Sequence, residues 1–186
     1  MIVAAERVLA KHGVAGFTTN HVAEVAGVSI GTLYQYFPNK QAIVATLIER
    51  NANQFAELVT EVLDAHPTAV PETVALAIAS GLVERFRTQG RVHFQLYEQI
   101  PTLGLINLLE AALEKLTDRL ARWLASNPHV AVPEPRATAW VFVRAIEGIA
   151  RGFAIASDVD VLVVARQAAA MLLSAVPRRR ANSTVE

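Results

Sequence analysis

Hydrophobic residues recur at helical spacing along most of the chain, and no convincing stretch alternates with the period of two expected of a β-strand. Val74, Ile78, Leu82 and Phe86, for example, follow one another at intervals of four. Glycine, proline and capping residues divide this pattern into segments. We therefore predict an all-α fold of about nine helices. The predicted helices span approximately residues 2–12, 19–26, 30–37, 40–65, 71–89, 91–99, 103–125, 135–156 and 158–176.

The second and third of these helices are short and closely spaced. Thr18 or Thr19 caps the first of the two, and Gly27 ends it. Ser29 caps the next, which stops before Pro38. Two short helices joined by a glycine-containing turn of three or four residues predict a helix-turn-helix.

The third predicted helix has an unusual composition for a core element. Leu33 and Phe37 lie four residues apart and supply a buried stripe. The remaining side chains carry hydroxyl and amide groups, and an amine follows just beyond the helix. Such a set suits phosphate oxygens and base edges of DNA. These polar residues are Thr32, Tyr34, Gln35, Tyr36 and Lys40.

About a dozen residues in this region agree in type and spacing with the DNA-binding signature of the tetracycline-repressor (TetR) family, which the sequence resembles. The resemblance covers approximately residues 1–48 and is only architectural beyond about residue 50. The alternative is a small helical bundle with a polar face. The matching residues are Thr18-Thr19, Val22-Ala23, Ala26-Gly27-Val28-Ser29, Gly31-Thr32-Leu33-Tyr34, Tyr36-Phe37 and Lys40.

The resemblance implies DNA-binding roles position by position. Thr19, Tyr36 and Lys40 would bind phosphates, and Gln35 would bind either phosphate or base. Ile30 is apolar, so it would touch a thymine methyl group or fill space. Gly31 would either let DNA approach the backbone or pack as a small residue against the preceding helix. The residues expected to face base edges are Asn20, Ile30, Gly31, Thr32 and Tyr34.

Charge is the least typical property for a DNA-binding protein. The formal net charge of the chain is zero, whereas DNA-binding domains usually carry a basic excess. Residues 1–50 carry four cations and three acids, a net of +1; these are Arg7, Lys11, Lys40 and Arg50 against Glu6, Glu24 and Glu49. Family members usually carry a basic arm before the position matched by Met1. The residues from Met1 onward do not include such an arm, so the sequence does not decide whether the protein contacts the minor groove.

Composition restricts the other classes of function. The chain is 53% hydrophobic and has no cysteine, and no apolar run reaches the roughly 18 residues of a membrane span. We expect a cytoplasmic protein without a cofactor. The five histidines are scattered without metal-site spacing, so no metal is expected. An all-α enzyme or carrier is disfavoured because there is no Gly-rich phosphate loop and no carboxylate–histidine set.

The last two predicted helices are apolar on most sides, and no later element covers them. We predict that they pair with their symmetry mates in a four-helix bundle, as in the family the chain resembles. The alternative is that they form the core of a monomer. The expected interface residues are Trp140, Phe142, Ile146, Ile149, Phe153, Leu162, Ala169 and Leu172.

The resemblance also implies an effector pocket, although aromatic residues at helical spacing more often belong to plain core than to a pocket. We expect a DNA-binding domain at 1–46, an effector-binding and dimerisation domain at 47–176, and a disordered tail at 177–186. The predicted function is a homodimeric repressor released from a palindromic operator by a small, hydrophobic effector; a dimer without any ligand is the alternative. The expected pocket residues are Phe55, Phe86, Phe94, Tyr97, Asn107 and Trp123.

Overall fold

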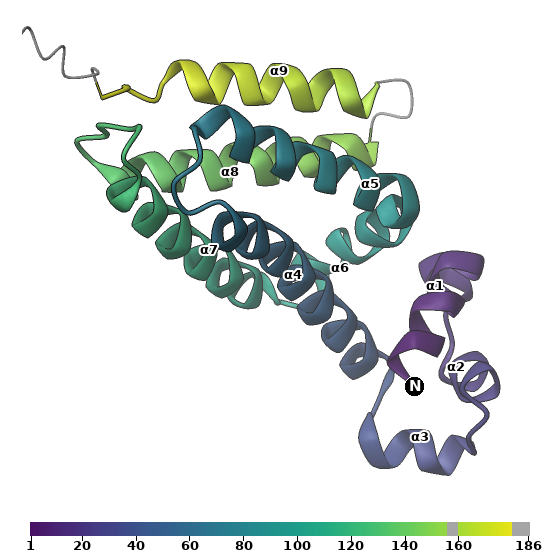
Figure 1. Cartoon of the computed structure of the whole chain (residues 1–186). Coiled ribbons are helices and arrows are strands. Elements are labelled where there is room, and N and C mark those ends of the chain that lie inside the picture. The colour runs from purple at the N-terminus through teal and green to yellow at the C-terminus, as the bar shows by residue number, and fades with distance from the viewer. Residues whose placement is uncertain (156–159, 180–186) are drawn as a thin grey trace, which may run out of the picture. The chain divides into compact units, whose positions relative to one another are not determined.

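The computed structural model describes residues 1–155 and 160–179, apart from a few side chains in the longer helices. The described part is helical throughout, which confirms the predicted fold class (Figure 1). Its only strand-like pairing is an isolated bridge between Val130 and Arg178. The helices are α1 (Ile2–Gly16), α2 (Thr19–Ala26), α3 (Ile30–Tyr36), α4 (Lys40–Ala65), α5 (Pro71–Tyr97), α6 (Gln99–Thr102), α7 (Ile106–Ser126), α8 (Pro135–Ile155) and α9 (Val161–Ser174).

The chain divides into two compact units. The first contains Met1–Phe55 and Arg85–Ala112, and the second contains Ala56–Glu84 and the described residues from Leu113 onward. Helices α4, α5 and α7 therefore contribute to both. This division differs from the expected boundary at residue 46, because the first unit also takes in the second half of α5 and all of α6.

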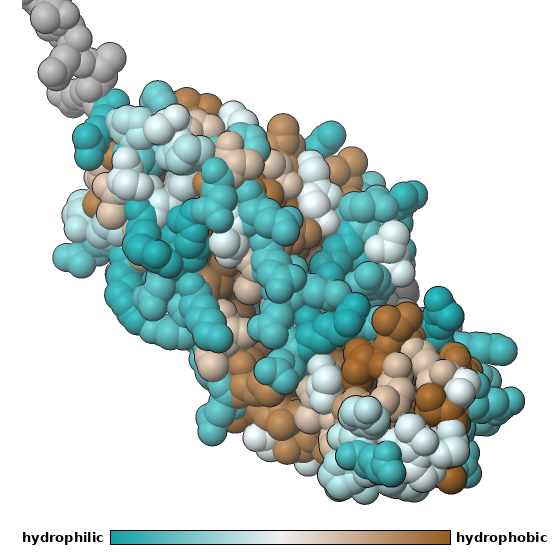
Figure 2. All heavy atoms as spheres, turned by 60° about the horizontal axis from the view of Figure 1, so that its bottom comes forward, coloured by the Kyte–Doolittle hydropathy of each residue, from teal (hydrophilic) through white to brown (hydrophobic). Residues whose placement is uncertain are grey.

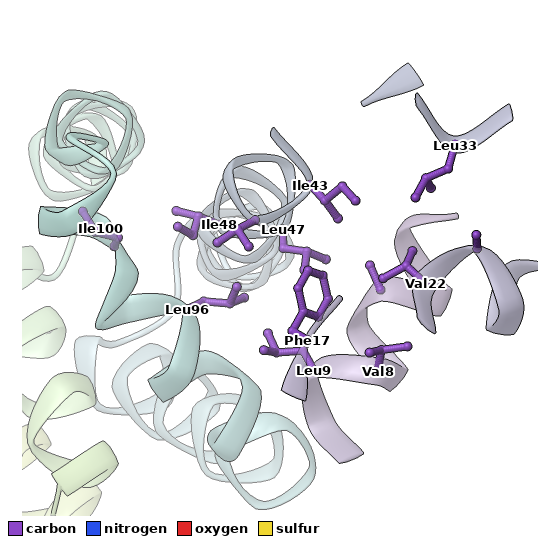
Figure 3. Packing of buried hydrophobic residues seen from close by; sticks show 13 residues of the cluster. Val8, Leu9, Phe17, Val22, Leu33, Ile43, Leu47, Ile48, Leu96 and Ile100 are labelled. Carbon is purple, nitrogen blue, oxygen red and sulfur yellow. The ribbon is translucent and has the colours of Figure 1, made fainter. Parts of the chain in front are cut away.

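The hydrophobic core of the first unit explains this enlargement. Phe17 is 1% exposed and lies beside Leu9 and Leu47 in Figure 3. Leu96 of α5 and Ile100 of α6 belong to the same buried cluster. Helices distant in sequence thus bury one continuous apolar surface with the helix-turn-helix.

Side chains cap the starts of α2 and α3, as predicted, and a further cap begins α4. Thr18 caps α2 by accepting a hydrogen bond from the His21 amide at 3.2 Å, and Ser29 caps α3 by accepting from the Thr32 amide at 3.0 Å. Asn39 Oδ1 accepts from the Ala42 amide at 2.8 Å at the start of α4. Each cap satisfies one of the backbone donors that a helix leaves free at its first turn.

The predicted break at Gly90 is wrong. Helix α5 is continuous from Pro71 to Tyr97, so the expected separate helix at 91–99 does not exist, and only the four-residue α6 follows. Glycine inside a helix costs only about 1 kcal/mol relative to alanine. Packing along a 27-residue helix readily outweighs that cost. Gly13, by contrast, does interrupt α1, with φ 66° and ψ 179°.

Buried polar side chains fasten the loops of the second unit. The Trp123 indole Nε1 donates to the His66 carbonyl at 2.9 Å. Asn127 is fully buried; its Nδ2 donates to the Ala69 carbonyl at 2.9 Å, and its Oδ1 accepts from the His129 amide at 2.9 Å. These bonds give partners to backbone groups of the loops, which helix and sheet pairing leave unbonded.

The C-terminal segment pairs with one of these loops. The Ala131 amide donates to the Pro177 carbonyl at 2.8 Å, and the Arg179 amide donates to the His129 carbonyl at 3.1 Å. Hydrogen bonds therefore hold residues 177–179 in place, whereas the sequence predicted a disordered tail from residue 177 onward. Residues 180–186 lie outside the described residues.

The last helix starts later than the sequence pattern indicated. Asp160 caps α9 by accepting hydrogen bonds from the amides of Leu162 and Val163. Ser157 and Asp158, the expected start, lie outside the described residues. None of the described helices combines the length and apolar character needed to cross a membrane.

Candidate nucleic-acid interface and apolar surface

Helix α3 presents nearly all of its predicted contact residues to solvent. Leu33 is completely buried and anchors the helix. Thr32 is half-buried, with Oγ1 2.8 Å from Ser29 Oγ at the cap. Five of the predicted residues are therefore exposed on one short helix; these are Ile30, Gly31, Tyr34, Gln35 and Tyr36.

A polar contact joins α2 to this helix. Thr19 Oγ1 lies 3.3 Å from the Tyr34 hydroxyl, so both side chains are positioned by one another. Asn20, beside Thr19, is exposed. Thr19 therefore lies next to the exposed Tyr34 of α3, and Asn20 follows it in the first turn of α2.

Histidine side chains support the turn between α1 and α2. The His21 ring stacks on that of His12 with centroids 5.2 Å apart, and its Nδ1 lies 3.2 Å from the Gly16 carbonyl oxygen. Among the described side chains, no group of three metal-ligating residues comes together. We assign this histidine pair a structural role in the turn.

Gly31 has no internal reason to be glycine. Its backbone is helical without a positive φ. A Cβ added there would meet only Ser29 Oγ, at an ordinary contact distance of 3.7 Å. Packing against α2, one of the two predicted explanations, therefore does not require glycine. Close approach of an external molecule to the α3 backbone is the explanation that the geometry favours.

Lys40 has an internal partner that the sequence pattern did not indicate. Its Nζ donates to the Val14 carbonyl at 3.1 Å and lies 5.7 Å from the centroid of the Phe17 ring. An ammonium group has three donors, so this contact leaves capacity for a phosphate oxygen. Lys40 also fastens the start of α4 to the end of α1.

Few cations of the first 50 residues are left for an external partner. Arg50 Nε pairs with Glu6 Oε1 at 3.1 Å, and Lys40 has the contact just described. Arg7 and Lys11 on α1 are exposed. In Figure 2 the helix-turn-helix, at the lower right, shows brown apolar and pale, weakly polar side chains, with less of the deep teal that marks the most hydrophilic residues.

A second exposed surface lies on α8 and α9, which run side by side (Figure 1). We call it the α8–α9 apolar surface. Trp140 and Leu162, both predicted interface residues, are 48% and 42% exposed. Three further exposed apolar residues of these helices were not predicted. They are Val141 at 52%, Val163 at 53% and Met171 at 72% exposure.

The remaining predicted interface residues are less accessible. Phe153 lies in α8, but its side chain is outside the described part. The others are half-buried in the single chain, so part of each apolar side chain packs inside the second unit and part is exposed at its surface. They are Phe142, Ile146, Ile149, Ala169 and Leu172.

The predicted effector residues do not all belong to one unit. Trp123 belongs to the second unit, where it is 4% exposed and bound to the His66 carbonyl. Asn107 is exposed and Phe55 is buried. The five residues that share the first unit are Phe55, Phe86, Phe94, Tyr97 and Asn107.

Fold and site together define a helical protein with an N-terminal helix-turn-helix. Residues 1–47 match the family model described as bacterial regulatory proteins, tetR family. The N-terminal helix-turn-helix thus matches the TetR family, in agreement with the resemblance of its sequence.

Comparison with individual proteins agrees with this assignment. The "Fatty acid metabolism regulator protein" of Bacillus subtilis is 32% identical over 110 residues, which are 59% of this chain and 50% of that protein. The chain thus matches about half the length of this relative.

Two solved structures share the fold over almost the whole chain. The fatty acid degradation regulator FadR from Bacillus halodurans superposes with a TM-score of 0.69 at 17% identity, covering 96% of this chain and 95% of that one. FadR from Bacillus subtilis in complex with stearoyl-CoA gives 0.63 at 20% identity, covering 93% and 96%. At these identities the likeness concerns the fold.

Proposed function

We propose that this protein is a homodimeric DNA-binding transcriptional repressor whose α3 enters the major groove. One observation carries the proposal: α3 exposes contiguous hydroxyl, amide and apolar side chains while Gly31 leaves its backbone open without any internal need. A buried helix or a merely solvated one would have no use for that combination. A recognition helix needs it, because base edges must approach closely.

The proposed roles follow from where each side chain lies. Tyr34 and Gln35 are exposed on α3 and contact base edges, with Tyr34 positioned by Thr19. Tyr36, 65% exposed at the end of the helix, binds phosphate. Lys40 binds phosphate with the donors that its contact to Val14 leaves over.

We further propose that the α8–α9 apolar surface forms a two-fold interface with a second copy of the chain. Monomeric proteins rarely leave large contiguous apolar patches in water. A two-fold interface uses the same patch on both chains. Binding to an inverted repeat then requires the two α3 helices of the dimer to lie about 34 Å apart, in successive major grooves.

The proposed effector is an amphipathic molecule with a long apolar part. This rests on the name of the Bacillus subtilis relative and on the neighbour bound to stearoyl-CoA. Phe86, Phe94 and Tyr97 share a unit with the helix-turn-helix and are the side chains proposed to sense it. An effector would release DNA if it bound more tightly to a conformation in which the two helix-turn-helix motifs of the dimer are wrongly spaced for DNA. The ratio of its affinities for the two conformations limits the size of this shift.

The effector proposal is tested by thermal melting with stearoyl-CoA and with free coenzyme A as its matched control. Stearoyl-CoA at a hundred times its dissociation constant should stabilise the protein by about 2.7 kcal/mol, which raises the melting temperature, and coenzyme A should not. Equal melting with and without stearoyl-CoA would favour the alternative of a DNA-binding dimer that needs no such ligand.

DNA binding is tested by selecting duplexes from a random library and measuring affinity for the selected duplex. Tyr34→Ala and Gln35→Ala should weaken binding, since both remove an exposed α3 side chain without touching the core. Lys115→Ala, an exposed change on α7, is the matched control and should bind as wild type. If no duplex is enriched, or all three variants bind alike, the proposed DNA-binding function fails.

A further inference from the structure

The DNA-facing side chains of this helix-turn-helix are electrically neutral to an unusual degree. Between Lys11 and Arg50 the sequence contains one cation, Lys40, and its Nζ lies against the Val14 carbonyl. Guanine is read mainly by arginine or lysine that bridges its O6 and N7 atoms. Helix α3 carries neither residue, so it has no such means of selecting guanine.

Ile30 occupies the position from which a recognition helix most directly reaches the bases. It is the first residue of α3, directly after the Ser29 cap, and it is 38% exposed. The N-terminal residues of a recognition helix are those that contact base edges. The side chain is β-branched and therefore stiff, so little rotamer freedom is lost when it packs on a ligand.

The neighbours of Ile30 complete an apolar contact site. Tyr34 lies four residues later, on the same side of the helix, is 48% exposed, and is positioned by Thr19 Oγ1 at 3.3 Å. Gly31 adds no side chain beside Ile30, and a Cβ there would meet only Ser29 Oγ, at 3.7 Å. A group entering here meets hydrocarbon rather than charge, with backbone accessible alongside.

We propose that Ile30 is a specificity-determining residue that recognises the 5-methyl group of a thymine, and that each half-site is rich in A·T pairs. The proposal rests on the proposed DNA-binding function. In the major groove, the thymine methyl is the apolar feature that distinguishes one base from the other three. The amide side chains Gln35 and Asn20 suit the adenine N6 and N7 atoms, which agrees with the same preference.

The test replaces thymine by uracil in the duplex that the full-length protein selects from a random library. Uracil pairs like thymine but lacks the methyl group, so the duplex keeps its hydrogen-bonding code. Binding is measured by fluorescence anisotropy with one thymine replaced at a time. Removing the contacted methyl should weaken binding about fourfold, and removing it from both half-sites about fifteenfold.

Variants connect this loss to Ile30. Ile30→Ala should weaken binding to the thymine duplex and bind thymine and uracil duplexes equally. Ile30→Val, which keeps a branched apolar side chain, should retain most of the discrimination. Val25→Ala changes an apolar residue of α2 that is 47% exposed, and it should discriminate as wild type does. Circular dichroism melting establishes that each variant is folded.

The outcomes separate this proposal from the one it rests on. Failure to enrich any duplex rejects DNA binding itself. Enrichment of a duplex whose affinity is unchanged by uracil at every position rejects methyl recognition. Discrimination that persists in folded Ile30→Ala assigns the methyl contact to another residue and overturns the role given to Ile30.

Discussion

Lys40 shows how one side chain can serve both folding and DNA binding. Its hydrogen bond to Val14 and its position over Phe17 were not readable from sequence, because the partners lie 26 and 23 residues away and are a backbone atom and a ring face. Replacing it therefore has two expected effects. Loss of the partly buried hydrogen bond should cost about 1 kcal/mol of folding stability.

Lys40→Ala should also weaken binding to all duplexes alike and make the slope of log K against log salt shallower by about one unit for each phosphate that Lys40 neutralises. Lys40→Arg is the charge-preserving control and should keep the salt dependence. A variant that melts earlier but shows the wild-type salt slope would restrict Lys40 to its structural contact.

Gly13 and Gly90 differ in whether the backbone conformation requires a glycine. Gly13 has φ 66° at the interruption of α1, where an L side chain is strained, whereas Gly90 lies inside the continuous α5 with ordinary room for a Cβ beside Phe86. Gly13→Ala should destabilise the fold by about 1–3 kcal/mol. Gly90→Ala should stabilise it by about 0.5–1 kcal/mol. Urea unfolding measures both, and opposite signs are required; a stabilising Gly13→Ala would contradict the assigned strain.

At the scale of elements, local signals located the starts of helices better than their continuity. Thr18, Ser29 and Asn39 form caps within three residues in sequence, so the pattern that predicts them is local. The continuity of α5 through Gly90 depends on packing that no local pattern encodes. The same holds for Leu96 and Ile100 in the core of the first unit.

In the candidate site, too, local features were predictable from the sequence and long-range contacts were not. The exposed α3 residues were predicted because a helix exposes what its buried stripe does not need, and Leu33 anchors that stripe. The role of Trp123 was not predictable, since its partner His66 is 57 residues distant. The roles of both surfaces in binding stay predictions.

The α8–α9 apolar surface predicts a specific way to dissociate the dimer. Val141 is 52% exposed, so Val141→Arg should leave the single chain folded while placing an unpaired charge in the interface. Sedimentation velocity at micromolar concentration should show a wild-type dimer and a variant monomer. Leu76→Arg, at a 59% exposed site on α5, is the matched control and should remain dimeric. A wild-type monomer would reject the interface.

At the scale of the whole molecule, near-neutrality predicts weak binding to non-operator DNA. With Arg50 paired to Glu6, each helix-turn-helix keeps Arg7, Lys11 and the remaining donors of Lys40. Counterion release of about 0.9 per phosphate contact then limits the salt slope of the dimer to about −5. Titration of a scrambled duplex at several salt concentrations measures it. A steeper slope would mean that cations outside the helix-turn-helix also contact DNA.

The central claim is that two copies of α3 read one duplex symmetrically, and hydroxyl-radical footprinting on the selected duplex tests it most directly. We predict two protected patches related by two-fold symmetry, with centres about one helical turn apart, and loss of both patches in Tyr34→Ala. A single patch, protection without symmetry, or a footprint that survives Tyr34→Ala unchanged would contradict the account.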